Sequence, residues 1–296
     1  MTQGSAFDSW FYQNCCGRAY ARDDQWLRFF AGIADRIAAD IPASAKATVG
    51  KPAAVEGTPG ESLKVLDAGC AMGFLVEALR ARGVDAEGLD ISAYAIDKVE
   101  GPARGHCRVA SLTDPLPGRY DLVVCIEVLE HMPPADAQAA LANLCAHTDD
   151  VLFSSSPFDV AEATHVNVLP PEGWAELFAR QGFLRDLDYD ASYITPWAVR
   201  YRRRSETMPR VVREYERAAA RLAIERNELR LQVQAFDRDV QTAAADAPRL
   251  RLELARVNEE LLAAQTRIAA LDDTVTHMQQ SVFWRLRQLI RGTRSR

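Results

Sequence analysis

The last third of the chain contains almost no proline or glycine. All but one of the fourteen prolines precede residue 210, and all but one of the sixteen glycines precede residue 183. Because these two residue types bend or end helices, a long stretch nearly free of them is predicted to be mostly helical. The change in composition also predicts a domain boundary at about residue 204.

Several sequence features of secreted and membrane proteins are missing. The N-terminus has neither a basic start nor an apolar core, and no run of 18 apolar residues occurs. The cysteines show neither C-x-x-C nor zinc-site spacing; they are Cys15, Cys16, Cys70, Cys107, Cys125 and Cys145. Such cysteines are typical of reduced thiols. We therefore predict a cytoplasmic protein.

Basic residues are scarce outside the end of the chain. The net charge is −6, and residues 281–296 hold five arginines and no acid, so the remainder carries −11. An acidic surface repels phosphate groups. Nucleic acid is therefore a poor partner for the body of the protein.

Residues 65–79 read as an apolar strand, a glycine turn and the start of a helix. Asp67, Gly69 and Gly73 would let the backbone approach a ligand at the carboxyl edge of a parallel sheet. A second apolar strand ends at Asp90, at the offset where a carboxylate accepts two ribose hydroxyls. The two segments together predict a site for a nucleoside-containing cofactor.

The chain contains neither G-x-G-x-x-G nor G-x-x-x-x-G-K-[ST], which argues against a cofactor with a pyrophosphate. The pattern instead resembles motif I of the class I S-adenosylmethionine-dependent methyltransferases, over residues 62–202. In this resemblance Asp90 is the ribose acid and residues 120–127 form the fourth strand. It implies S-adenosylmethionine as the cofactor.

The resemblance also implies which residues contact the cofactor. They are Asp67, Gly69, Ala71, Gly73, Asp90, Ile91, Ser111, Leu112 and Ile126. Two of them depart from the family pattern: Ala71 replaces the middle glycine, and Ser111 stands where many members place an aspartate for the adenine amino group. A Rossmann-like domain that has lost its cofactor is the alternative.

Strands and helices are predicted to alternate over residues 62–204. The expected strands lie near residues 63–67, 86–90, 106–109, 121–126, 150–155, 184–189 and 197–202. Such alternation builds an α/β fold, a Rossmann-like sheet with helices on both faces. By the resemblance, the last strand runs antiparallel.

The segment before this domain, residues 1–61, is predicted to be a helical lid and a linker. Residues 7–41 are rich in aromatic residues at helical spacing, whereas residues 42–61 have no apolar period. A break between helices could bring Tyr20 or Arg22 to the cofactor carboxylate or to the acceptor.

Residues 205–280 carry apolar residues in alternating steps of four and three. This heptad repeat predicts a parallel homomeric coiled coil, and a single amphipathic helix lying on the domain is the alternative. Pro248 is expected to bend or restart the helix without changing its apolar seam, with Asp246 as the cap of a second segment.

Residues 281–296 form a basic, amphipathic tail. Val282, Phe283, Leu286, Leu289 and Ile290 would share one side of a helix. This pattern predicts an anchor on an anionic membrane, at the inner face of the cytoplasmic membrane. The frayed end of the coiled coil is the alternative.

The fourth predicted strand runs into Glu127, Glu130 and His131. If a helical turn begins there, spacings of three and four residues place the three side chains on one face. His165 follows the fifth strand and belongs to the same edge of the sheet. Two carboxylates and two imidazoles could hold a divalent cation, Mg²⁺ or Mn²⁺, that lowers the pKa of an acceptor hydroxyl.

The E-x-x-E-H string with a later histidine is similar to the metal sites of small-RNA terminal 2′-O-methyltransferases, and its first part to ubiquinone-pathway O-methyltransferases. Relatives without a known metal share the same string. Catalysis without metal, by His131 or His165 as general base with Glu127, is therefore the second interpretation. The third is a structural role.

The whole architecture resembles bacterial methyltransferases of cell-surface polysaccharide assembly, of the O-antigen type. This resemblance implies O-methylation of a sugar or glycan close to the membrane. One alternative is a coiled-coil scaffold of a membrane-proximal glycan-assembly complex with secondary or no activity. The other is an RNA 2′-O-methyltransferase, which the metal motif favours and the acidic body disfavours.

Overall fold

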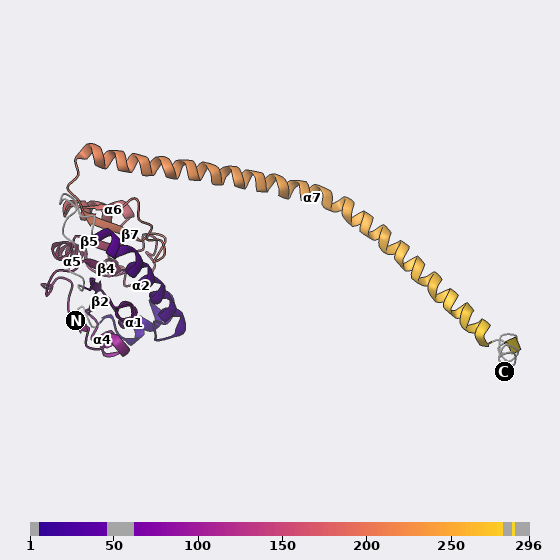
Figure 1. Cartoon of the computed structure of the whole chain (residues 1–296), viewed down its shortest axis with the longest axis horizontal. Helices are drawn as coiled ribbons and strands as arrows, with labels where there is room; N and C mark the ends of the chain where they lie inside the picture. Colours follow the sequence, from indigo (N-terminus) through magenta and orange to yellow (C-terminus); the bar gives the residue numbers. More distant parts are fainter. Residues whose placement is uncertain (1–5, 46–61, 281–285, 288–296) are drawn as a thin grey trace. The chain divides into compact units, whose positions relative to one another are not determined.

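The computed structural model describes residues 6–45, 62–280 and 286–287. The chain divides into two compact units, residues 1–216 and 217–296. The first unit is built on a seven-stranded sheet of order β3-β2-β1-β4-β5-β7-β6 (Figure 1). Its strands are β1 (Lys64–Ala68), β2 (Asp85–Asp90), β3 (Cys107–Val109), β4 (Leu122–Ile126), β5 (Asp150–Ser154), β6 (Phe183–Arg185) and β7 (Val199–Arg203).

The first five strands are parallel, and β7 runs antiparallel to both β5 and β6. The predicted α/β sheet and its antiparallel last strand are thereby confirmed. Strand β1 lies between β2 and β4, so the strand order reverses there. In open α/β sheets, ligands bind at the carboxyl edge beside such a reversal.

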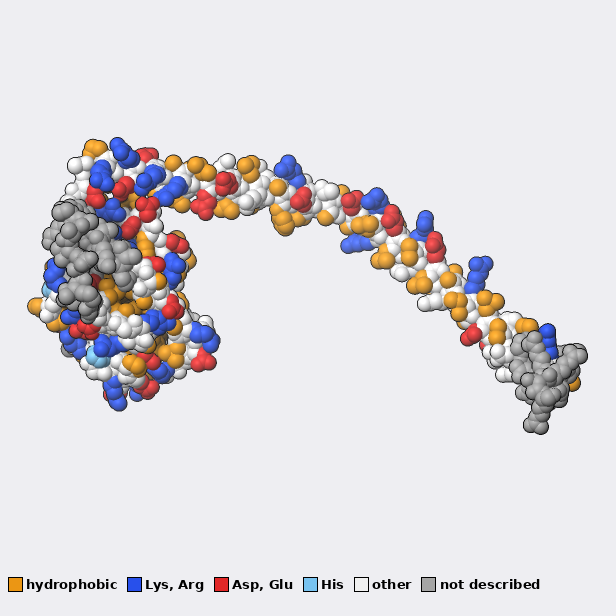
Figure 2. Space-filling view, in the orientation of Figure 1, with side chains coloured by type: hydrophobic (Ala, Val, Ile, Leu, Met, Phe, Trp, Pro, Cys, Tyr) orange, Lys and Arg blue, Asp and Glu red, His pale blue; other side chains and the backbone are white. Residues whose placement is uncertain are grey.

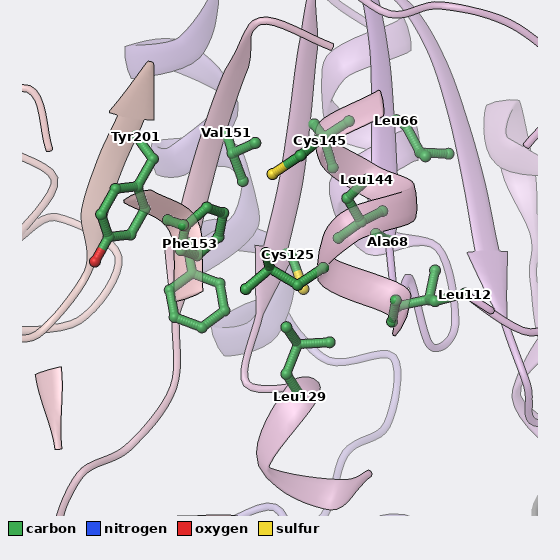
Figure 3. Packing of buried hydrophobic residues seen from close by; sticks show 14 of the residues in the cluster. Leu66, Ala68, Leu112, Cys125, Leu129, Leu144, Cys145, Val151, Phe153 and Tyr201 are labelled. Atoms are coloured by element: carbon green, nitrogen blue, oxygen red, sulfur yellow. The ribbon is translucent and has the colours of Figure 1, made fainter. Parts of the chain in front are cut away.

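The sheet is buried on both faces, as the apolar runs of its strands require. Along β4, Leu122 and Val124 join one hydrophobic cluster, whereas Val123 and Cys125 join the other. This alternation is the two-residue period of a strand. Figure 3 shows the cluster that contains Cys125.

Helices cover both clusters. The cluster of Figure 3 is covered by α5 (Pro134–His147) and α6 (Pro171–Arg180), which bury residues such as Leu144 and Phe178. The opposite face is covered by α2 (Asp24–Ala45) and α3 (Phe74–Arg80). The short helices α1 (Ser9–Asn14) and α4 (Ala93–Asp97) contribute to a third, smaller cluster.

The predicted N-terminal lid has two parts with different roles. Ile33, Ile37 and Ile41 of α2 are at most 1 % exposed and belong to the core beside the sheet. The part of the N-terminal segment that reaches the cavity described below is residues 7–30. The beginning of the segment therefore lines the cavity, where a lid is predicted, and its end is a structural helix.

The helix α7 (Met208–Gln280) runs for 73 residues without interruption and passes through Pro248 (Figure 1). The helix does not restart there, and Asp246 is not a cap: it lies inside the helix, 3.6 Å from Arg249. None of the α7 residues is buried. Hydrophobic side chains are visible along its surface in Figure 2.

Among the described helices, none is both long enough and apolar enough to cross a membrane. The predicted membrane-anchoring tail, residues 281–296, lies outside the described residues except for Leu286 and Arg287, which are helical and exposed. The anchor therefore stays a prediction.

Candidate active site

A cavity of about 450 Å³ opens at the carboxyl edge of the sheet. Most of the residues predicted for the site line it: Asp67, Gly69, Ala71, Asp90, Ile91, Ser111, Leu112, Ile126, Glu127, His131 and His165. Gly73 and Glu130 lie outside the lining. The fold thus brings eight of the nine predicted cofactor residues and the two predicted histidines to one cavity.

The turn after β1 requires glycine because of its backbone conformation and its packing against other residues of the chain. Gly69 has a φ of +88°, and a Cβ on it would lie 2.3 Å from Cγ2 of Val128. Gly73 has a φ of +73°, and its Cβ would lie 3.0 Å from Sγ of Cys107. Both glycines therefore permit close packing between the turn after β1 and its neighbours. At Gly69, this packing also shapes the wall of the cavity.

Asp90 ends β2 with a carboxylate that is 9 % exposed and faces the cavity. Its Oδ2 accepts a hydrogen bond from the N–H of Ala71 (2.8 Å), and its Oδ1 accepts one from the N–H of Ser92 (2.7 Å). Burial raises the pKa of Asp90, and these two bonds oppose that rise. Each oxygen keeps a lone pair for a further donor, such as a ribose hydroxyl.

Asp67 is the penultimate residue of β1, is close to Asp90 and is 5 % exposed. Burial, and then the charge of Asp90, raise the pKa of Asp67 to about 8. The carboxyl group is therefore mostly protonated at pH 7. A cationic ligand group would reverse this, because it favours the carboxylate.

The first residues of the lid are fixed against the cofactor side of the cavity. Ser92 donates a hydrogen bond from Oγ to the carbonyl of Phe7 (2.6 Å), and Asp8 caps α1 through the N–H groups of Trp10 and Phe11. Tyr20 lines the cavity. This agrees with the expectation that Tyr20 reaches the site.

Arg22 does not reach the cofactor side. Its guanidinium makes two hydrogen bonds to the carboxylate of Glu77 on α3, at 2.7 and 2.8 Å. Of the two residues expected to reach the site, Tyr20 lines the cavity and Arg22 is instead paired with Glu77. A long-range ion pair of this kind cannot be predicted from the sequence, since the two residues are 55 positions apart.

The turn after β4 differs from the predicted α-helical one. Glu127 has a φ of +52°, and a single 3₁₀ turn follows at Leu129–His131. The carboxylate of Glu127 accepts hydrogen bonds from Ser154, Trp197 and the N–H of Ser156. Glu127 is therefore held towards β5 and β7 instead of sharing one helical face with Glu130 and His131.

Three of the four predicted metal ligands do come together. Ligand atoms of Glu130, His131 and His165 lie within 4.8 Å of one another, and the two imidazole rings are 4.6 Å apart. Glu127 is not a member of this group. Two imidazoles and a carboxylate are a donor set that first-row divalent cations accept.

Glu130 is fully buried, and within the described residues neither of its carboxylate oxygens has a hydrogen-bond partner. Burial, and then the charge of Glu127, raise the pKa of Glu130 well above its usual value. A buried carboxyl without partners costs free energy unless a proton or a cation neutralises it. Its surroundings therefore fit a cation that displaces the proton.

Both histidines are oriented through Nδ1. The Nδ1 of His165 lies 2.7 Å from the carbonyl of Asp159, and that of His131 lies 3.0 Å from Oγ1 of Thr164. Burial, and then His165, lower the pKa of His131 to about 4. Where a carbonyl lies against Nδ1, as at His165, Nε2 stays available as a base or a ligand.

Several lining residues were not singled out from the sequence. Trp197 precedes β7 and binds Glu127, while Tyr12, Cys16 and Thr195 line other parts of the cavity. Aromatic spacing in residues 7–41 pointed to a lid but did not identify which side chains face inwards. Nothing local in the sequence distinguishes Trp197 from a core tryptophan.

Comparison with known families agrees with this geometry. Residues 28–184, just over half of the chain, match the family described as "Methyltransferase domain". The chain belongs to this family. The predicted enzyme class, a methyltransferase with a Rossmann-like sheet, is confirmed.

Similar curated proteins are named ubiquinone biosynthesis O-methyltransferase. The protein of Methylococcus capsulatus is 39% identical over 105 residues, which cover 31% of this chain and 43% of that protein. That of Alkalilimnicola ehrlichii is 32% identical over 146 residues, covering 44% and 58%. The chain thus spans about half the length of these relatives.

Solved structures with a similar fold are methyltransferases too. Magnesium protoporphyrin IX methyltransferase from Synechocystis, solved with bound S-adenosylmethionine, has 19% identity and a TM-score of 0.47, covering 69% of this chain and 98% of that one. A sugar N-methyltransferase from Streptoalloteichus has 15% identity and a TM-score of 0.45, covering 60% and 88%.

Proposed function

We propose that this protein is an S-adenosylmethionine-dependent O-methyltransferase that acts on a sugar or glycan in cell-surface polysaccharide biosynthesis. The observation that carries the methyl-transfer part is one cavity lined both by Asp90 and by His131 and His165. S-adenosylmethionine, when bound, supplies an electrophilic methyl group. Asp90 would hold its ribose, and Asp67 would lie near its cationic part.

The residues of the chain provide what an alcohol acceptor needs. Holding the acceptor oxygen in line with the methyl group supplies much of the rate. The free Nε2 of His131 or His165 accepts the hydroxyl proton as the O–CH₃ bond forms. The lowered pKa of His131, about 4, keeps its ring unprotonated at neutral pH and also makes it a weaker base. The aromatic lid excludes water from the reacting atoms.

A sugar or glycan acceptor is supported by the resemblance in architecture, namely a methyltransferase domain followed by a heptad-repeat helix. A phenolic acceptor is the second candidate, because the curated relatives are named for ubiquinone biosynthesis. Comparing a deletion strain with its parent by mass spectrometry separates the two. Loss of one methyl increment from surface glycans supports the first, and loss from the quinone pool supports the second.

Two further alternatives remain as predictions. A scaffold with secondary or no activity would not need the buried Asp90 or the paired histidines, so these residues favour the enzyme. An RNA 2′-O-methyltransferase would have to bind phosphates with a body of net charge −11, once the basic tail is set aside.

The cofactor part of the proposal is tested by calorimetry with S-adenosylhomocysteine. Replacing Asp90 by Asn removes charge-assisted hydrogen bonds worth about 1.5–3 kcal/mol, which corresponds to roughly a 10- to 100-fold weaker affinity. Circular dichroism of Asp90→Asn checks that the fold is retained. Absence of binding by the native protein would refute the cofactor assignment.

The metal part has its own test. Glu130, His131 and His165 would hold Mg²⁺ or Mn²⁺, and the bound cation would lower the pKa of an acceptor hydroxyl. We expect Mn²⁺ binding by the native protein and its loss in Glu130→Gln, with S-adenosylhomocysteine affinity unchanged.

Glu127→Gln is the matched variant, and we expect it to keep Mn²⁺. If Glu127→Gln also loses Mn²⁺, the result supports the four-ligand site predicted from the sequence. If native protein binds no Mn²⁺ and turnover is full in excess EDTA, catalysis by the histidines without metal is the remaining mechanism.

A further inference from the structure

The apolar seam of α7 has no covering element among the described residues, and none of the helix is buried. We infer that α7 pairs with the same helix of a second copy, as a parallel, in-register, two-stranded coiled coil. A helix of about 110 Å with one exposed apolar stripe is unlike a solvated single helix and needs a partner along its whole length.

The seam is continuous from residue 219 to residue 278. In heptad notation, position a is taken by Ala219, Arg226, Val233, Val240, Ala247, Leu254, Leu261, Ile268 and Val275. Position d is taken by Leu222, Leu229, Phe236, Ala243, Leu250, Val257, Ala264, Leu271 and Met278. Because α7 continues through Pro248, these positions share one register.

Charges beside the seam fix the orientation of the partner. In a parallel, in-register pair, each g residue faces the e residue five positions later on the other helix. Three such positions pair two charged residues: Glu225 with Arg230, Asp246 with Arg251, and Arg267 with Asp272. All three combinations are attractive, and no pair joins like charges.

An antiparallel pair would instead bring g residues against g residues. Five of the six charged g residues are acidic; they are Glu225, Asp239, Asp246, Glu253 and Glu260, with Arg267 as the exception. Facing each other, they would repel. Charge complementarity therefore selects the parallel arrangement of two identical chains.

The seam residues indicate two strands. Four of the nine a positions are β-branched, and four of the nine d positions are leucine, which is the combination typical of parallel dimers. Arg226 interrupts the a positions with a charge. In a dimer its long side chain can reach solvent, whereas the closed core of a trimer or tetramer would bury it.

The stoichiometry is tested on the full chain by light scattering during gel filtration. We expect twice the chain mass of 32.8 kDa at micromolar concentration. A mass of one chain would overturn the inference, and a mass of three chains would overturn its two-stranded form.

The orientation is tested by reversing one charge. Glu225→Arg places arginine against Arg230 twice in a parallel dimer, and we expect roughly tenfold weaker dimerisation at low salt, lost in 1 M NaCl. A mixture with Arg230→Glu chains restores the attraction and should form mixed dimers. An antiparallel dimer does not bring positions 225 and 230 together, so failure of Arg230→Glu chains to restore dimerisation would refute the parallel arrangement.

The register is tested by disulfide formation. Cysteine at position 229, a d site, would meet its own copy in an in-register parallel dimer, so Leu229→Cys should give disulfide-linked dimers on oxidation. Arg238→Cys, at the outward f site, is the matched control, and the native chain with its own cysteines is the blank. Equal linking at both sites, or none at position 229, would refute the register.

Discussion

The two aspartates of the cavity wall show how position changes the chemistry of one residue type. Asp90 accepts two backbone hydrogen bonds that counteract part of the cost of burial. Asp67 has Asp90 as a charged neighbour, and its pKa rises to about 8. The pair therefore holds one proton near neutral pH, in the part of the cavity where a cationic cofactor would lie.

We expect cofactor binding to release this proton. At pH 7 a group with a pKa of about 8 is roughly nine-tenths protonated, and an ammonium group beside Asp67 stabilises its ionised form. The affinity for S-adenosylhomocysteine should therefore rise as the pH increases towards 8. Calorimetry in two buffers of different ionisation enthalpy should report release of close to one proton.

Asp67→Asn is the control for this prediction, since it should bind with an enthalpy that does not depend on the buffer. The same lack of dependence in the native protein would contradict the prediction. In the absence of ligand, the stability of the fold depends on pH in the opposite direction to the binding affinity. Because the folded state holds the proton of Asp67 more tightly than the unfolded state does, Asp67 stabilises the fold less as the pH rises from about 4 to 8.

At this scale, the sequence predicted residues whose role depends on strand ends. Asp67 and Asp90 lie in the last two residues of β1 and β2, and parallel strands bring their carboxyl ends to one edge. The orientation of Glu127 could not be predicted in this way. Its φ of +52° depends on contacts with Ser154 and Trp197, which are remote in sequence.

At the scale of elements, the turn after β1 and the turn after β4 fit together. Val128 occupies the space that a Cβ on Gly69 would need. The loop that would bind the cofactor and the loop that carries Glu130 and His131 are thus in direct contact. Strain in one turn is expected to displace the other.

Gly69→Ala should accordingly destabilise the fold by more than its backbone conformation alone explains. A positive φ costs a non-glycine residue roughly 1–2 kcal/mol, and a Cβ 2.3 Å from Cγ2 of Val128 adds overpacking of about 1–3 kcal/mol. Urea denaturation measures the sum. Gly17→Ala is matched, with a φ of +70° and no atom within 4 Å of its Cβ, so it reports the backbone part.

If Gly69→Ala and Gly17→Ala lose the same free energy of unfolding, the contact with Val128 carries no cost. The double variant Gly69→Ala with Val128→Ala provides a second check. It should recover part of the loss, because the smaller side chain leaves room for the new methyl group.

Most helices and strands were predictable because, in their segments, the hydrophobic period and the flanking turn residues indicate the same element. The 3₁₀ turn at Leu129–His131 was not, since a string of helix-favouring residues gives no local sign that its first residue adopts a left-handed conformation. At Pro248 the sequence predicts a continuous apolar seam but does not distinguish a bent helix from a restarted one, whereas α7 continues through the proline. Strong helix formers on both sides of the proline favour continuity.

At the scale of the whole chain, the sequence predicted a catalytic part followed by a helical part. The first is confirmed by the family match and the sheet. Oligomerisation and membrane binding stay predictions, because they depend on surfaces that act between molecules. The single-chain fold does not determine them.

The tail is tested by truncation after Met278. Burial of the tail's apolar side chains at a membrane would yield roughly 1.5–3 kcal/mol for each one fully buried, and each arginine adds about 1 kcal/mol near anionic lipids. The full chain should therefore sediment with anionic vesicles at physiological salt, and the truncated chain should not. Replacing the five arginines by glutamine is the charge control; sedimentation of the truncated chain would contradict the anchor.

Ser92 links Asp90 to the start of the lid. Its N–H binds Asp90, its Oγ caps α4 at the N–H of Ala95, and the same hydroxyl holds the carbonyl of Phe7 at the start of the lid. Whatever docks on Asp90 also steadies the residue from which the lid begins. We therefore expect a ligand at Asp90 to stabilise the start of the lid before a second substrate binds.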